Sequence, residues 1–166
     1  MEIVAEHAYP TLVGADMVRS IRHIKARVEK ERVPPGEDPD FHLKLGPGGL
    51  SDIEFLVQML QLRVGHSEPL ARTPSTMGGL RALEGLGLLT AVETAGLAES
   101  YQLCTRIRNR LFLQIARPYD SLPTDGEESA RLARSLGYDN RSELREEYRR
   151  VTRRARRIFE KKFYAD

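Results

Sequence analysis

Two carboxylates separated by one residue are the first groups in this sequence that could do chemistry. Asp38 and Asp40 flank Pro39 and form the only Asp-x-Asp pair in the chain. Paired carboxylates on a strand can hold magnesium ions, which prefer oxygen ligands. Here proline interrupts the pair, and no strand pattern contains it. We therefore interpret 38–40 as an acidic surface loop and predict no metal site.

A glycine-rich segment follows at Gly46-Pro47-Gly48-Gly49. Such a loop before a helix could offer backbone N–H groups to a phosphate. It lacks the Gly-Lys-Ser/Thr ending of a nucleotide-binding P-loop, and no clear strand precedes it. We favour a tight turn in which glycine lets two chain segments approach closely.

Asp52 and Glu54 suggest general acid and base catalysis, but their spacing argues against it. Residues two apart on a helix point about 160° apart, so the two carboxylates cannot share a metal or a substrate atom. Asp52 is suited to accept backbone N–H groups in the first turn of a helix. Glu54 shares a polar strip with Gln58 and Gln61, which either faces a partner domain or forms internal hydrogen bonds.

The remaining nucleophiles and metal ligands show no catalytic or metal-binding pattern. The four histidines are scattered without metal-ligand spacing, and we interpret them as structural or surface residues: His7, His23, His42 and His66. The single cysteine, Cys104, falls on a predicted buried helical face and excludes an internal disulfide. We predict no catalytic, cofactor-binding or metal-binding residue.

The elements that position these residues are predicted to be helices. Residues 50–65 form the most apolar helix, with Ser51 and Glu54 in capping-box spacing. Long helices are predicted at 91–116 and 142–164, capped by Thr90 and Ser142. The first helix starts near Asp16 and carries an apolar stripe of Met17, Ile21, Ile24 and Val28. No segment alternates like a strand, so we predict an all-α bundle of five to six helices over 16–166, preceded by an N-terminal arm at 1–15.

Composition is that of a soluble globular protein, with 40% hydrophobic and 30% charged residues and a net charge of +2. One cysteine and no signal-peptide pattern fit a reducing cytoplasm. The basic residues gather on the last predicted helix, opposite its apolar stripe. The cations expected to meet a partner are Arg149, Arg150, Arg153, Arg156 and Arg157. Because interleaved aromatic residues are missing, an acidic protein or solvent is favoured over nucleic acid.

The segment from Gly46 to Phe55, with Gln58 and Leu60 to Leu62, resembles the signature of bacterial glutamine synthetase adenylyltransferases. Weaker matches cover roughly 16–164, including Arg72-Thr73, Ser121-Leu122-Pro123-Thr124 and Phe159. The resemblance is to the C-terminal helical domain of that family, and PII uridylyltransferases have a related domain. It implies a parent enzyme that uses ATP and magnesium to adenylylate glutamine synthetase and also removes the AMP group, under control of glutamine and, in many members, the PII protein.

The resemblance implies a non-catalytic regulatory or scaffolding domain, inactive alone because it lacks the metal carboxylates. It also implies that the signature docks on the nucleotidyltransferase domain of the same protein. The residues expected at that contact are Lys44, Gly48, Gly49, Asp52, Glu54, Gln58 and Gln61. The alternative is an autonomous basic helical adaptor for nucleic acid or an acidic protein. No membrane partner is expected.

Overall fold

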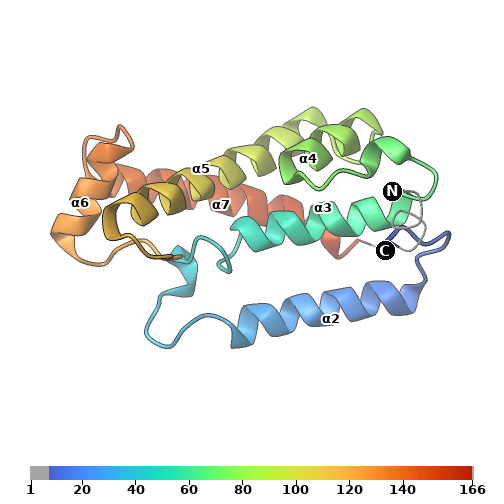
Figure 1. Ribbon diagram of the computed structural model, residues 1–166, viewed down its shortest axis with the longest axis horizontal. Helices are drawn as coiled ribbons and strands as arrows, with labels where there is room; N and C mark the ends of the chain where they lie inside the picture. The colour runs from blue at the N-terminus through green and yellow to red at the C-terminus, as the bar shows by residue number, and fades with distance from the viewer. Residues whose placement is uncertain (1–7, 166) are drawn as a thin grey trace.

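A computed structural model describes residues 8–165, which form six α-helices and two single-turn 3-10 helices (Figure 1). In chain order these are α2 (Ala15–Glu31), η1 (Pro39–Phe41), α3 (Leu50–Val64), η2 (Pro69–Ala71), α4 (Thr76–Gly85), α5 (Ala91–Ile115), α6 (Gly126–Ser135) and α7 (Arg141–Phe163). Within this range β-pairing is limited to one isolated antiparallel bridge between His42 and Ser121. The prediction of an all-α bundle is confirmed.

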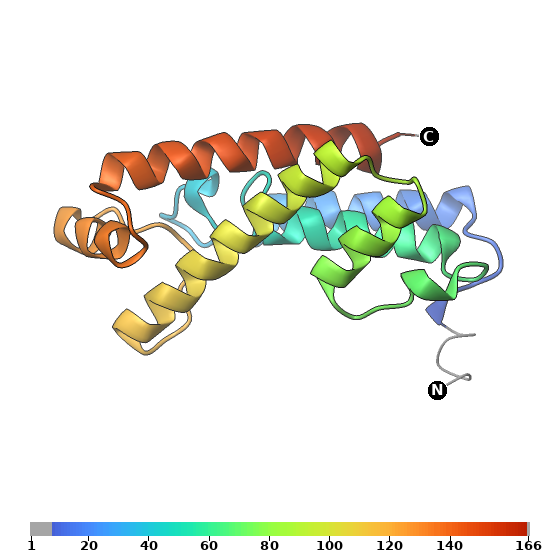
Figure 2. The ribbon, with the colours of Figure 1, turned by 90° about the horizontal axis from the view of Figure 1, so that it is seen from above.

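Helix α3 lies in the middle of the bundle and contacts α2, α4, α5 and α7. Its buried residues lie on more than one side of the helix, as a central helix requires: Ile53, Leu56, Val57, Met59 and Leu60 are all nearly inaccessible to solvent. The long helices α5 and α7 pack against each other at an angle, close together near the start of α5 and diverging toward its end (Figure 2). The bounds predicted for the central helix and the two long helices agree with the structure to within one residue.

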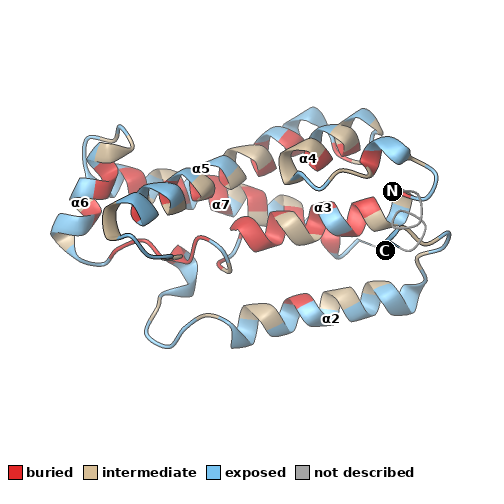
Figure 3. Ribbon diagram, in the orientation of Figure 1, coloured by how far each residue is buried: buried red, intermediate tan, exposed pale blue. Residues whose placement is uncertain are grey.

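The core has two halves joined by α5 and α7. One half packs α6 and the segment around Phe41 and Leu43 against Leu111 of α5 and Tyr148 of α7. The other packs α3 and α4 against the first half of α5 and the last turns of α7, where Phe159 and Phe163 stack. Burial is therefore concentrated along α3, α5 and α7 (Figure 3). Because these helices span both halves, they fix the position of the segment between α2 and α3.

Several helix starts differ from those predicted. The Thr90–Glu93 capping box of α5 and the Asp125 cap of α6 are present. The predicted Ser51–Glu54 box is absent. Instead, the Leu50 and Ser51 N–H groups donate to the carbonyls of Leu43 and Lys44, at 3.0 and 2.9 Å. Backbone carbonyls already satisfy these orphan donors, so a capping side chain is not needed there.

Two further N-caps were predicted at the wrong residue. Helix α7 is capped by Asn140, whose side chain accepts the N–H groups of Ser142 and Glu143, and not by Ser142. Helix α2 begins after Gly14, and Asp16 lies in its first turn. The predicted arm at 1–15 stays a prediction, since residues 1–7 lie outside the described residues.

The inward face of α2 is rotated relative to the predicted stripe. Met17 and Ile24 are 41% and 52% exposed, while Val18 and Ile21 pack against the core. Lys25 takes the inward position that was assigned to Ile24 and is fully buried. The predicted stripe was wrong at these positions because a lysine was assumed to face solvent.

Candidate functional site

The turn at 46–49 is held between α5 and α7. Gly48 has φ +73°, and a Cβ atom placed there would lie 2.0 Å from the carbonyl oxygen of Thr152 in α7. On its other side the Gly48 carbonyl accepts the Ser100 hydroxyl of α5, at 2.7 Å. Gly48 therefore lets the backbone of the turn contact the backbone of α7, which a side chain would prevent.

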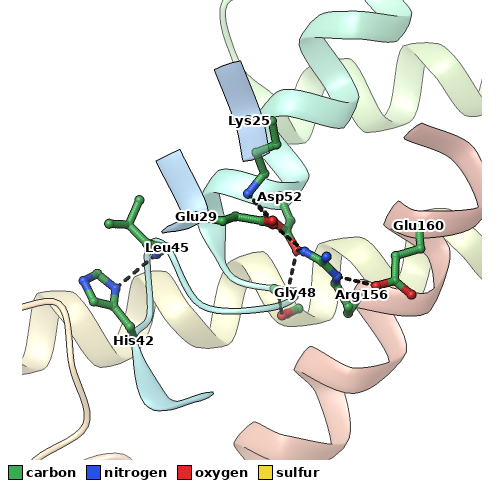
Figure 4. A network of polar contacts seen from close by, with 9 residues as sticks. Lys25, Glu29, His42, Leu45, Gly48, Asp52, Arg156 and Glu160 are labelled. Atoms are coloured by element: carbon green, nitrogen blue, oxygen red, sulfur yellow. Dashed lines mark hydrogen bonds and ion pairs between the residues drawn. The ribbon is translucent and has the colours of Figure 1, made fainter. Parts of the chain in front are cut away.

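Asp52, in the first turn of α3, connects this turn to two other helices (Figure 4). Its Oδ2 atom accepts the Gly48 N–H at 2.7 Å and lies 3.0 Å from Nη1 of Arg156. Its Oδ1 atom lies 2.5 Å from Nζ of Lys25. The prediction that Asp52 accepts a backbone N–H group is confirmed, and two buried or half-buried cations add to that role.

Glu29 and Glu160 complete the network. Oε1 of Glu29 lies 3.0 Å from Lys25 Nζ and 2.5 Å from Arg156 Nη1, and Oε1 of Glu160 accepts Arg156 Nε at 2.7 Å. Burial alone would raise the pKa of Glu29, but hydrogen bonds from Arg156 and Lys25 outweigh it and lower that pKa. We call Lys25, Glu29, Asp52, Arg156 and Glu160 the ionic joint. It joins α2, α3 and α7 at the signature turn.

The buried Lys25 ammonium is compensated on several sides. Besides its two carboxylate partners, it lies 5.5 and 5.7 Å from the ring centroids of Phe159 and Phe55. Paired carboxylates and aromatic faces are the surroundings in which a buried cation is tolerated. Neither Lys25 nor Glu29 was predicted. Helical spacing could have predicted the position of Lys25, because it follows Ile21 by four residues and precedes Val28 by three and so lies on the same face of α2.

Of the seven residues predicted to dock on a catalytic domain, four are buried within this chain: Gly48, Gly49, Asp52 and Gln61. For Gln61 the structure shows the second alternative, internal hydrogen bonds, because its amide donates to the carbonyls of Ala71 and Thr73 at 2.7 and 2.9 Å. Lys44 and Gln58 are exposed. Glu54 is half-buried and accepts the Tyr101 hydroxyl at 3.3 Å.

The five cations predicted to form a partner surface fall into two groups, those held by several carboxylates of this chain and those exposed along α7. Arg156 belongs to the ionic joint, and Arg150 is bound to Glu99 and Glu147, at 2.5 and 2.8 Å. Arg149, Arg153 and Arg157 are exposed along α7. The predicted surface is therefore reduced by the two arginines that make internal ion pairs.

The other sequence candidates are structural. His42 is buried, and its Nδ1 atom accepts the N–H groups of Lys44 and Leu45, which shapes the turn. Asp38 caps η1 by accepting the Asp40 N–H, and both carboxylates are exposed. Cys104 is buried, and burial raises the pKa of its thiol to about 12.

Two further properties of the described residues concern metal binding and membrane crossing. Among residues 8–165, no three His, Cys, Asp or Glu side chains are grouped in a way that could hold a metal ion. Every helix in the same range falls short of the length or the apolar character that crossing a lipid bilayer requires. The arrangement around Asp52 connects α2, α3 and α7.

The fold and the ionic joint define an all-α bundle whose helices meet at a glycine-rich turn. The sequence model of the family described as GlnD PII-uridylyltransferase matches residues 17–163, and the chain belongs to this family. It is 46% identical, over 99% of its length, to the bifunctional glutamine synthetase adenylyltransferase/adenylyl-removing enzyme of Streptomyces avermitilis. The enzyme of the same name from Mycolicibacterium smegmatis is 43% identical over 91% of the chain. The chain spans only 17% and 15% of these two relatives.

Proposed function

We propose that this chain is a non-catalytic regulatory or scaffolding domain of an enzyme that adenylylates and deadenylylates glutamine synthetase, in control of nitrogen assimilation. The observation that carries the proposal is the match of nearly the whole chain to a small part of enzymes whose name states that activity. The burial of the signature residues supports a structural role for this part. ATP and magnesium then bind elsewhere in the parent enzyme, which acts in the cytoplasm.

The proposed role is to hold a catalytic domain in position. The ionic joint makes the turn and three helices one unit, so a domain attached to it is held in a defined orientation. Three of the predicted docking residues keep accessible polar groups beside the turn: Lys44, Glu54 and Gln58. Interdomain surfaces within one chain are typically modest and polar, which suits these side chains. Glutamine synthetase and the PII protein are the proposed outside partners.

The test uses a chimaera of the Streptomyces avermitilis enzyme in which this chain replaces the matching segment. The chimaera should adenylylate glutamine synthetase, and Glu54→Ala with Gln58→Ala should lower that rate while the melting temperature stays nearly unchanged. An inactive chimaera that is folded would contradict the proposed domain role. Full activity of the double variant would contradict only the docking contact through Glu54 and Gln58, and would leave the proposed domain role standing.

A further inference from the structure

Helix α7 carries an arginine at every fourth position over five positions. These residues, which we call the arginine ridge, are Arg141, Arg145, Arg149, Arg153 and Arg157. Residues four apart on an α-helix are about 6 Å apart along the axis and turned by about 40°. The ridge therefore runs for about 24 Å along the helix and turns by about 160° in all, so only neighbouring members such as Arg149, Arg153 and Arg157 face one partner.

The ridge lacks the counter-charges that neutralise other cations of α7. Across the described part of the chain, Arg149 is the one ridge residue within ion-pair distance of a carboxylate, and its partner Glu146 is 3.8 Å away and largely exposed. Arg150 and Arg156 of the same helix each pair with two or more carboxylates. The ridge charge is thus left for a ligand outside this fold.

Two ridge guanidinium groups are already held in place. Those of Arg145 and Arg149 lie 3.7 and 4.8 Å from the ring centroid of Phe41, which itself stacks on Tyr148. Stacking occupies the flat face of a guanidinium and leaves its N–H edges free for bidentate contacts. Burial and the neighbouring Arg149 lower the pKa of Arg145, against the opposing effect of Asp38. Positive groups are therefore crowded together here.

The surface is hollowed on both parts of the ridge. Arg141 and Arg145 line a hollow of about 320 Å³ with Pro123 and Ser129. Arg149, Arg153 and Arg157 line a second hollow of about 340 Å³ beside Pro47 and Thr152. Neither hollow has an aromatic wall on which a nucleic-acid base could stack.

We propose that the arginine ridge is a docking surface for an acidic helical segment of a partner protein. A helix with carboxylates at every fourth position repeats at the same spacing as the ridge, so several guanidinium–carboxylate contacts form together. The hollows offer no aromatic wall for bases, and the chain has a net charge of only +2, so a protein segment suits the ridge better than a nucleic acid does. The inference rests on α7 itself and does not depend on the proposed function.

The test measures binding of the whole chain to a fluorescein-labelled helical peptide with glutamate at every fourth position, by fluorescence anisotropy. A peptide of the same composition with irregular glutamate spacing is the first comparison, and a single-stranded oligonucleotide of equal charge is the second. The regular peptide should bind most tightly, and its affinity should fall as salt is raised. Absence of binding, equal binding of the irregular peptide, or tighter binding of the oligonucleotide would each overturn the proposal.

A pair of charge reversals assigns the binding to the ridge. Arg153→Glu with Arg157→Glu should weaken peptide binding by about tenfold or more, because attraction becomes repulsion. Arg131→Glu with Arg134→Glu, which makes the same charge change at exposed positions of α6, should change it by less than about twofold. Circular dichroism checks that both variants fold, and Arg153→Gln with Arg157→Gln should give an intermediate loss. Equal effects of the two reversals would mean that only net charge matters.

Discussion

Nζ of Lys25 in α2 lies 2.5 Å from Oδ1 of Asp52 in α3, and both side chains are buried. Removing one partner of a buried ion pair leaves the other charge without compensation. Lys25→Met should therefore lower the free energy of unfolding by about 3 kcal/mol, measured by urea denaturation. Arg27→Met, which removes an exposed α2 cation paired with Glu31, should cost less than about 0.5 kcal/mol. Equal losses in the two variants would show that Lys25 does not hold α2 in place.

Gly48 tests whether the turn must contact α7 closely. Gly48→Ala should cost about 3 kcal/mol, because the new Cβ would meet the Thr152 carbonyl in addition to requiring a left-handed backbone. Gly87 has the same φ of +73°, but a Cβ atom placed there would have no neighbour within 4 Å. Gly87→Ala therefore isolates the cost of the backbone conformation and should lower stability by about 1 kcal/mol. Urea unfolding of both variants gives the comparison, and similar costs would argue against the close contact.

Substitutions of Gln61 and Gln58 compare a buried with an exposed position of the polar strip. Gln61→Ala should lower stability by about 1–3 kcal/mol, because the carbonyls of Ala71 and Thr73 lose their donor. Gln58→Ala, at an exposed position of the same helix, should change it by less than about 0.5 kcal/mol. Thermal and urea unfolding of the two variants check this, and a neutral Gln61→Ala would contradict the burial of its amide.

The sequence predicted the fold well because helix periodicity is local. The bounds of α3, α5 and α7 follow from apolar spacing and, for α5, from the Thr90–Glu93 capping box. The ionic joint could not be predicted in the same way, because Lys25, Asp52 and Arg156 lie far apart in the chain and meet only after three helices pack. The sequence left the role of Gln61 open for the same reason, since its acceptors lie in the segment after α3.

Glu93 gives a pH dependence with a defined sign. Burial would raise its pKa, but hydrogen bonds from the Thr90 N–H, Lys162 and Lys161 outweigh burial and lower the pKa to about 2. The carboxylate is therefore bound more strongly in the folded than in the unfolded chain. Its contribution to stability is full above about pH 5 and is lost as the pH falls from the unfolded value of about 4.5 through about 2.

Glu93→Gln should show this as a difference between two titrations. The free energy of unfolding of the parent chain should exceed that of the variant at pH 6, and the gap should close as the pH approaches about 2. Urea denaturation at a series of pH values measures both curves. A gap that stays constant across this range would mean that the Glu93 carboxylate is not stabilised by folding.

Our central proposal is that this chain is part of an adenylylating enzyme and does not perform the reaction itself. The most direct measurement incubates the purified chain with glutamine synthetase, magnesium and radiolabelled ATP, beside the complete Streptomyces avermitilis enzyme. We expect labelled glutamine synthetase with the complete enzyme and none with the chain alone. Magnesium-dependent labelling by the chain alone would contradict the account, because it would require catalytic groups in the part that we assign to scaffolding.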